Sequence, residues 1–236
     1  VALDYDNDGK DEIAALYQVP GEWAHTQLYT WDFDGVGTGM AVTQRLCYDS
    51  GAGNYAANYT THRVVGGDFD GDGYDELGAI YYYPETGKYS LHKFDIWTGG
   101  ASYTNLIYKK NDIDATKVTG RVAGCNYNGI AGDEILCIYD NSGSIPVSMR
   151  NQVFYFESSE NGWKTSSMYT SPENTFDAVN PTHLIVSGYF TADNIEDTVI
   201  FYNLPALNPM NRRTRMYICS NAYSYYYCIW DPRGTL

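Results

Sequence analysis

The chain has 236 residues, of which 44 % are hydrophobic, so it can bury a sizeable core. Its formal charge of −14 disfavours nucleic acid and anionic membranes as partners, because proteins that bind phosphates gather Lys and Arg against them. No run of about 18 apolar residues is present, so we expect no insertion into a membrane.

An acidic motif occurs four times along the chain. It reads DYDNDGKDEIAALY from Asp4, DFDGDGYDELGAIY from Asp68, NYNGIAGDEILCIY from Asn126 and YFTADNIEDTVIFY from Tyr189. The acidic residue just before each apolar run falls at Glu12, Glu76, Glu134 and Asp197, at intervals of 64, 58 and 63 residues. Self-similarity at a nearly fixed period is typical of a repeat architecture.

Predicted strands flank each motif. Upstream, the segments HRVVGGDF from His62, GRVAGCNY from Gly120 and HLIVSGYF from His183 read as apolar strands that end at or near Gly67, Gly124 and Gly188. We expect these three glycines to lie at equivalent points. Downstream, each apolar run is followed by a segment that alternates apolar and polar residues, the period of a half-buried strand. These segments are QLYTWDF from Gln27, SLHKFDI from Ser90, QVFYFES from Gln152 and RMYICSN from Arg215.

A fourth, less regular strand completes each unit of about 60 residues, and no convincing amphipathic helix interrupts the pattern. The sequence therefore predicts an all-β fold, a β-propeller of four-stranded antiparallel blades. The single domain would cover 1–236, with repeats at approximately 1–61, 62–119, 120–182 and 183–236. A β-sandwich is the alternative, although a sandwich does not require a repeated sequence.

The pattern of a strand, a glycine, DFDGDGYDEL and a second strand resembles the FG-GAP or VCBS repeat. That family includes integrin-type propellers, secreted lectins and non-catalytic modules of extracellular enzymes and toxins. The resemblance extends through all four copies and is strongest in the second. Family propellers commonly have seven blades, so these four either close alone or belong to a larger ring. Because the chain opens inside its first motif, we expect a longer parent protein.

The resemblance also implies calcium. In the family, the loop between the first two strands resembles half an EF-hand and binds the ion through its first, third, fifth and ninth residues and the carbonyl of the seventh. Carried over to this chain, the ligands would be Asp68, Asp70, Asp72, Tyr74 and Glu76 in the second loop, and Asp4, Asp6, Asp8, Lys10 and Glu12 in the first. The family usually has Asp at the ninth position, where both loops carry Glu.

The residue types agree with this implication. Calcium takes six to eight oxygen ligands, and alternate residues of a tight turn can aim several carboxylates at one point. Gly9 and Gly73 stand where such a turn needs a backbone conformation that is costly for other residues.

The last two copies of the motif depart from the pattern. The third loop has Asn126 and Asn128 but Ile130 at the fifth position, where an oxygen is needed. The fourth keeps Asp193 and Asp197 but has Tyr189 and Thr191 at the first and third positions. We expect no ion in either loop.

Five cysteines are present, with no spacing that suits zinc: Cys47, Cys125, Cys137, Cys219 and Cys228. Cys219 and Cys228 could face each other across a hairpin, as could Cys125 and Cys137, which would fit an oxidising compartment. Five reduced thiols are the alternative. Together with the family resemblance, the possible pairs favour a secreted or cell-surface protein.

The sequence contains no GxSxG, HExxH or GxxxxGK[ST] motif. Its 24 tyrosines suit sugar stacking and protein interfaces as well as a packed core. We therefore expect a non-catalytic, calcium-stabilised module whose partner is a glycan, as in a lectin. An extracellular structural or protein-interaction subunit is the second interpretation, and a calcium-dependent polysaccharide lyase or hydrolase is the third.

Overall fold

The computed structural model describes eleven segments of the chain: residues 1–34, 41–83, 88–97, 100–106, 122–140, 149–157, 162–170, 181–192, 195–204, 213–219 and 226–230. Nearly all regular structure in them is β, with one 3₁₀ turn, η1 (Ala57–Thr60). Within these segments there is no helix with the length and hydropathy that crossing a membrane requires.

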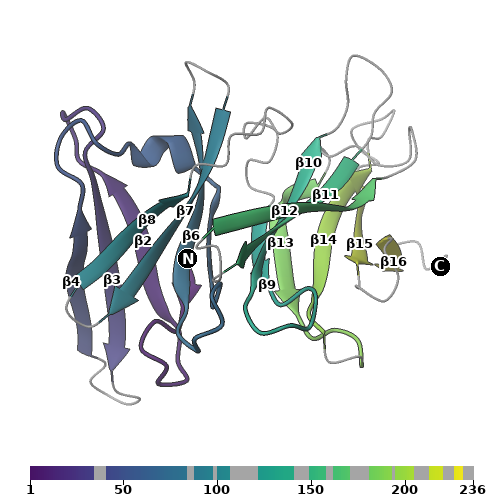
Figure 1. Ribbon diagram of the computed structural model, residues 1–236. Helices are drawn as coiled ribbons and strands as arrows, with labels where there is room; N and C mark the ends of the chain where they lie inside the picture. Colours follow the sequence, from purple (N-terminus) through teal and green to yellow (C-terminus); the bar gives the residue numbers. More distant parts are fainter. Residues whose placement is uncertain are drawn as a thin grey trace. The chain divides into compact units, whose positions relative to one another are not determined.

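The strands form four antiparallel sheets, each built from four strands that are consecutive in the sequence (Figure 1). Sheet 1 contains β1 (Ala2–Leu3), β2 (Glu12–Gln18), β3 (Thr26–Asp34) and β4 (Ala41–Asp49). Sheet 2 contains β5 (Val64–Gly67), β6 (Glu76–Tyr83), β7 (Lys88–Trp97) and β8 (Gly100–Leu106). Sheet 3 contains β9 (Val122–Cys125), β10 (Glu134–Asp140), β11 (Met149–Glu157) and β12 (Gly162–Thr170). Sheet 4 contains β13 (Pro181–Gly188), β14 (Asp197–Leu204), β15 (Arg213–Cys219) and β16 (Tyr226–Trp230).

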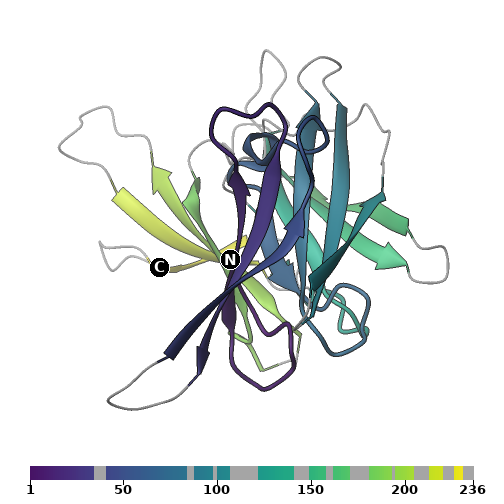
Figure 2. The same cartoon turned by 90° about the vertical axis from the view of Figure 1, so that its left-hand side faces the viewer.

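The chain divides into two compact units, Val1–Ala115 and Thr116–Leu236. Unit 1 holds sheets 1 and 2, and unit 2 holds sheets 3 and 4. The strands of each sheet twist about one another, which is plain for sheet 4 in Figure 2, where they run from green to yellow. The predicted all-β class, with four antiparallel strands in each sheet, is confirmed.

The acidic motifs connect the first two strands of each sheet. We call them acidic turns 1 to 4: residues 4–12, 68–76, 126–134 and 189–197. In every sheet the marker carboxylate begins the second strand, opposite the last residue of the first: Leu3 faces Glu12, Gly67 faces Glu76, Cys125 faces Glu134 and Gly188 faces Asp197.

This register tests the expected equivalence of the three glycines. Gly67 and Gly188 occupy matching positions, as predicted. The prediction for Gly124 is wrong by one residue, because Gly124 faces Ile135 and the buried Cys125 holds the last place of its strand. Gly124 therefore corresponds to Gly66, the first glycine of the Gly66-Gly67 pair.

Close backbone approach explains why a small residue is needed at that position. A Cβ on Gly66 would lie 2.5 Å from the main-chain oxygen of Ala2, a distance that no real side chain tolerates. In unit 2 the Ser187 hydroxyl donates a 2.6 Å hydrogen bond to the main-chain oxygen of Gly124. In each unit, therefore, the first strands of the two sheets lie against each other, β1 with β5 and β9 with β13.

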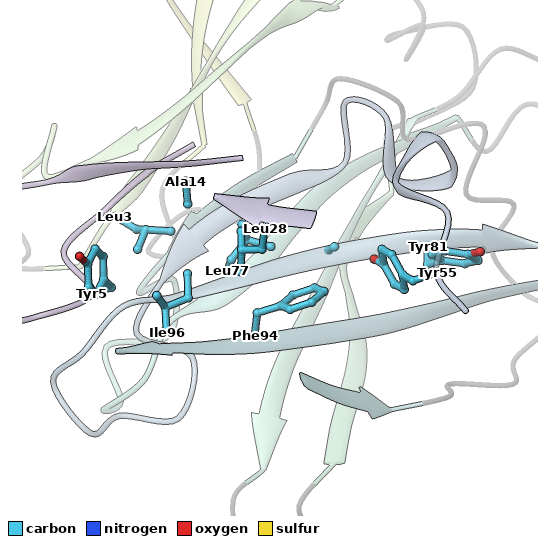
Figure 3. Packing of buried hydrophobic residues seen from close by; sticks show 10 residues of the cluster. Leu3, Tyr5, Ala14, Leu28, Tyr55, Leu77, Tyr81, Phe94 and Ile96 are labelled. Carbon is cyan, nitrogen blue, oxygen red and sulfur yellow. The ribbon is translucent and has the colours of Figure 1, made fainter. Parts of the chain in front are cut away.

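The core of unit 1 joins the facing sides of its two sheets (Figure 3). Leu28 from β3 meets Leu77 from β6 and Phe94 from β7, and all three are fully buried. Phe94 also packs edge-on against Tyr48, with ring centroids 5.5 Å apart, and against Tyr55 at 5.8 Å. Hydrophobic side chains at alternate positions of the strands thus close one shared interior.

Many tyrosines of unit 1 pack in this core. Tyr55, Tyr81 and Tyr103 surround the buried imidazole of His92, whose two nitrogens bond the hydroxyls of Ser90 and Tyr103. Burial lowers the pKa of His92 to about 3, so the ring is neutral at ordinary pH. The high tyrosine content is therefore explained in part by packing.

The positions of the cysteines reduce the number of possible disulfide pairs. Cys125 and Cys137 are not joined by a disulfide; Cys125 faces Glu134 and Cys137 faces Val122. Cys219 and Cys228 lie on the neighbouring strands β15 and β16, with Cys228 opposite Tyr217 and Cys219 opposite Tyr226. Because the side chains of Cys219 and Cys228 lie outside the described residues, their disulfide stays a prediction.

Replacing Phe94 by Ala should lower the free energy of unfolding by about 3–5 kcal/mol, because it removes a fully buried ring and leaves a cavity between the two sheets. The measurement is urea unfolding followed by circular dichroism. Val42→Ala is the control, since Val42 is 50 % exposed and its truncation should cost much less. Equal losses in the two variants would mean that Phe94 does not join the sheets.

Candidate metal centre

The first aspartate of acidic turns 1 and 2 organises the backbone of its own turn. Asp4 accepts hydrogen bonds from the main-chain N–H groups of Asp8 at 3.0 Å and Gly9 at 2.9 Å. Asp68 accepts them from Gly71, Asp72 and Gly73 at 2.8–3.0 Å. Gly9 and Gly73 adopt φ values of 84° and 93°, the left-handed region that favours glycine. The backbone of both turns is thus held in place by these hydrogen bonds.

Most of the predicted ligands come together in these two turns. Carboxylate oxygens of Asp68, Asp70, Asp72 and Glu76 lie within 4.8 Å of one another, as do those of Asp4, Asp6 and Asp8. Glu12 lies outside the second of these groups. The main-chain N–H groups of Lys10 and Tyr74 donate to Asp8 at 2.9 Å and Asp72 at 3.0 Å. That the carbonyls of Lys10 and Tyr74 bind an ion stays a prediction.

Glu12 and Glu76 are the buried members of the two turns, each only 3 % exposed. Burial raises the pKa of Glu12 to about 7, and the charges of Asp6, Asp32 and Asp4 add to the effect. Burial likewise raises the pKa of Glu76 to about 8, although the Lys93 charge acts in the opposite direction. A cation beside Glu12 would likewise lower its pKa and favour the ionised form.

Turn 1 contains buried oxygens that lack a hydrogen-bond partner. Within the part of the chain that the structure describes, neither Oε2 of Glu12 nor Oδ1 of Asp6 has one. A buried carboxylate oxygen without a donor or a cation is costly, whereas calcium binds such oxygens directly. The residues of turn 1 therefore fit a calcium ion, which would supply the positive charge that its carboxylates lack.

Turn 2 contains a cation that the sequence interpretation missed. The ammonium of Lys93, on β7, contacts Asp70 and Asp95 and lies 3.5 Å from Glu76 Oε1. The Lys93 side chain is only 4 % exposed. The sequence signal was a lone lysine within SLHKFDI, a strand expected to pack against the core, where an unpaired charge would be costly.

Turns 3 and 4 satisfy their marker carboxylates with uncharged donors. In turn 3 the side-chain amide of Asn128 donates to Glu134 Oε1, and the N–H of Tyr127 donates to Oε2 at 2.8 Å. In turn 4 Asp197 accepts from the N–H groups of Phe190 at 3.0 Å and Thr191 at 2.7 Å, and from the Thr191 hydroxyl at 3.3 Å.

Ile130 and Asp193 stand at the fifth positions of turns 3 and 4. Ile130 is 67 % exposed at the fifth position of turn 3, and its N–H donates to Asn128. Asp193, in turn 4, lies outside the described residues.

A reciprocal pair of hydrogen bonds links neighbouring turns within each unit. The N–H of Asp4 donates to an Asp75 carboxylate oxygen at 2.9 Å, and the N–H of Asp75 donates to the main-chain oxygen of Asp4 at 3.0 Å. Asn126 and Glu196 form the same pair in unit 2, at 2.7 Å and 3.2 Å. The first residue of one turn is thereby fixed to the eighth residue of the next, so ordering one turn also orders its neighbour.

Comparison with known proteins does not assign this chain to a family. No protein-family model matches it, and no curated protein matches it.

Without calcium, Glu12 should make the protein less stable as the pH rises. Its pKa is about 7 in the folded chain against an ordinary value of 4.5, so folding takes up a proton in this interval. The resulting stability is fully present below about pH 4.5 and is lost as the pH passes through about 7.

The measurement is the free energy of unfolding in urea, from about pH 5 to pH 8 with a chelator present. Glu12→Gln should flatten the decline, whereas Asp11→Asn, a change at an exposed neighbouring carboxylate, should keep the wild-type slope. If the free energy of unfolding fell with pH at the same slope in Glu12→Gln and in wild type, Glu12 would not be the source of the decline.

Proposed function

We propose that this chain is a calcium-stabilised β-propeller module of the FG-GAP or VCBS type that works outside the cell, secreted or at the cell surface, by binding a partner. The observation that carries the proposal is the gathering of carboxylates in turns 1 and 2, at the alternate positions that a calcium loop requires.

The arrangement of the sheets supports blades of a propeller. Each sheet uses four consecutive strands in their sequence order, as a blade does. Within each unit the first strands of the two sheets lie against each other, as strands near a central axis would. The small residues Gly66 and Gly124 at this approach fit such crowding.

Calcium in this proposal acts as a structural ion. An ion held by Asp6 and Glu12 would fix turn 1, and the hydrogen bonds between Asp4 and Asp75 would transmit that order to turn 2 of the next sheet. Because the Asp4–Asp75 hydrogen bonds join turns of neighbouring sheets, the ion would stiffen one end of unit 1. A rigid end of this kind is a suitable platform for binding loops.

The contact between Ser90 and His92 does not support catalysis. Ser90 and His92 are a hydroxyl and an imidazole in contact, the pairing that nucleophilic enzymes use. Both are buried, at 0 % and 1 % exposure, in the tyrosine-lined core. A substrate could not reach them, so the pair serves packing.

A hollow beside the acidic turns favours carbohydrate as the partner. It has a volume of about 450 Å³, and its lining includes Tyr74, Trp97, Asp72 and Asp95. Tyr74 and Trp97 are 46 % and 50 % exposed. Exposed aromatic faces stack on the C–H faces of sugars, and carboxylates accept hydrogen bonds from sugar hydroxyls. This hollow is the candidate glycan site of a lectin-like module.

Calcium should stabilise the chain against thermal unfolding. For a Kd of about 0.1 mM, usual for extracellular modules, about 1.5 mM free calcium adds RT ln(1 + 15), roughly 1.6 kcal/mol per site. The measurement is the melting temperature with calcium and with chelator, combined with calorimetric ion counting. The double variant Asp6→Ala, Asp70→Ala should lose the response, and Asn128→Ala, in turn 3, should keep it. No response in the wild-type chain would refute the proposed calcium dependence.

Glycan binding is tested on an array of neutral and acidic oligosaccharides with calcium present. Trp97→Ala should reduce binding about fivefold to thirtyfold, because loss of an aromatic stacking face costs about 1–2 kcal/mol. Trp23→Ala is the matched control, since Trp23 is 74 % exposed but does not line this hollow. Binding that survives Trp97→Ala would exclude the hollow as the site.

A further inference from the structure

The four acidic turns share one electrostatic requirement. Each begins its second strand with a carboxylate that is at most 3 % exposed: Glu12, Glu76, Glu134 and Asp197. In every turn a main-chain N–H of the turn's second residue, at Tyr5, Phe69, Tyr127 or Phe190, donates to that carboxylate. The turns differ in which group partners the second oxygen of the carboxylate. Whether the chain provides such a partner determines whether the turn needs an ion.

In three turns the chain itself provides a partner for the second oxygen of the marker carboxylate. The donor is the amide of Asn128 in turn 3 and the hydroxyl of Thr191 in turn 4. In turn 2 the ammonium of Lys93 lies 3.5 Å from Glu76 Oε1. Among the four marker carboxylates of the described turns, turn 1 is the exception, because Glu12 Oε2 is buried without a partner. The third residues of turns 1 and 2 do not differ in this respect, since Oδ1 of Asp6 and Oδ1 of Asp70 are both buried without a partner.

The strand register identifies the residue responsible for the difference between turns 1 and 2. Lys93 on β7 faces Gly78, two residues after Glu76. Thr30 on β3 faces Ala14, two residues after Glu12. Thr30 therefore occupies in sheet 1 the place that Lys93 occupies in sheet 2. Threonine has no charge, so sheet 1 lacks the internal cation at this position.

Arg45 on β4 does not fill the same role for turn 1. Its Nη1 donates to the Tyr5 hydroxyl at 3.1 Å, and its Nη2 lies 3.8 Å from Asp32 Oδ2. These contacts leave the unpartnered oxygens of Asp6 and Glu12 without a donor.

We infer that Lys93 is the built-in counter-ion of turn 2, so that turn 1 is the high-affinity calcium site of unit 1 and turn 2 holds its shape without metal. This inference rests on the proposed calcium function and specifies which turn performs it. The ammonium contacts Asp70 and neighbours Glu76, two of the predicted ligands, and so it competes with a divalent ion for them. The affinity of turn 2 is at least about tenfold lower than that of turn 1.

The direct test is calorimetric titration of the full chain with calcium chloride. Wild type should bind about one ion with high affinity. Asp6→Asn should abolish this binding together with the rise in melting temperature, because it removes a ligand of turn 1. The matched variant Asp70→Asn should keep both.

Exchanging the residues at the two equivalent positions tests the role of Lys93 itself. Lys93→Met should raise the calcium affinity of turn 2 at least about tenfold and bring the count to about two ions. It should also make the fold of unit 1 depend more strongly on calcium. Thr30→Lys should weaken the binding at turn 1 and reduce the loss of melting temperature caused by a chelator. The two titrations of single-ligand variants keep the test valid even if Thr30→Lys does not fold.

Three outcomes would overturn the inference: two ions bound by wild type with equal affinity, loss of the calcium response in Asp70→Asn but not in Asp6→Asn, or unchanged calcium binding in Lys93→Met. In each of these the protein still binds calcium, so the proposed function would stand. Absence of any calcium binding in wild type and in Lys93→Met would instead refute the proposed function.

Discussion

A buried carboxylate at the start of the second strand is the constraint on which each sheet depends. Glu12, Glu76, Glu134 and Asp197 are all excluded from water, and a buried charge needs hydrogen bonds or a cation to offset its lost hydration. Each carboxylate ties the acidic turn to its sheet through a main-chain N–H of the turn. The group that neutralises or hydrogen-bonds this carboxylate therefore fixes the shape of the turn. It also fixes the start of the following strand and the contact with the neighbouring turn.

The four turns meet this requirement in different ways. Asn128 and Thr191 use neutral hydrogen bonds, and Lys93 brings a positive charge from the third strand of its sheet. Turn 1 alone among the described turns leaves an oxygen of its marker carboxylate, Oε2 of Glu12, buried without a partner, which is a fitting environment for a hard cation. Calcium dependence would then be concentrated at one turn, whose bond between Asp4 and Asp75 carries its order into the next sheet.

The strand order and the marker carboxylates were predictable because they depend on local patterns that repeat. Alternating apolar residues and acidic turns with glycine at Gly9 and Gly73 define them within a few residues. The one-residue error at Gly124 arose because the third copy puts Cys125 where the others have glycine or leucine, and register depends on pairing across strands. Lys93 was missed for a related reason: it reaches turn 2 from a strand 17 residues beyond Glu76, and such contacts are set by tertiary packing.

Crystals of the full chain grown with calcium would test the central claim most directly, through the anomalous scattering of the bound ion. The account predicts an anomalous peak in turn 1, at about 2.3–2.6 Å from oxygens of Asp6 and Glu12, with the Lys93 ammonium still on Asp70 in turn 2. A peak in turn 2 with Lys93 displaced, and none in turn 1, would contradict it.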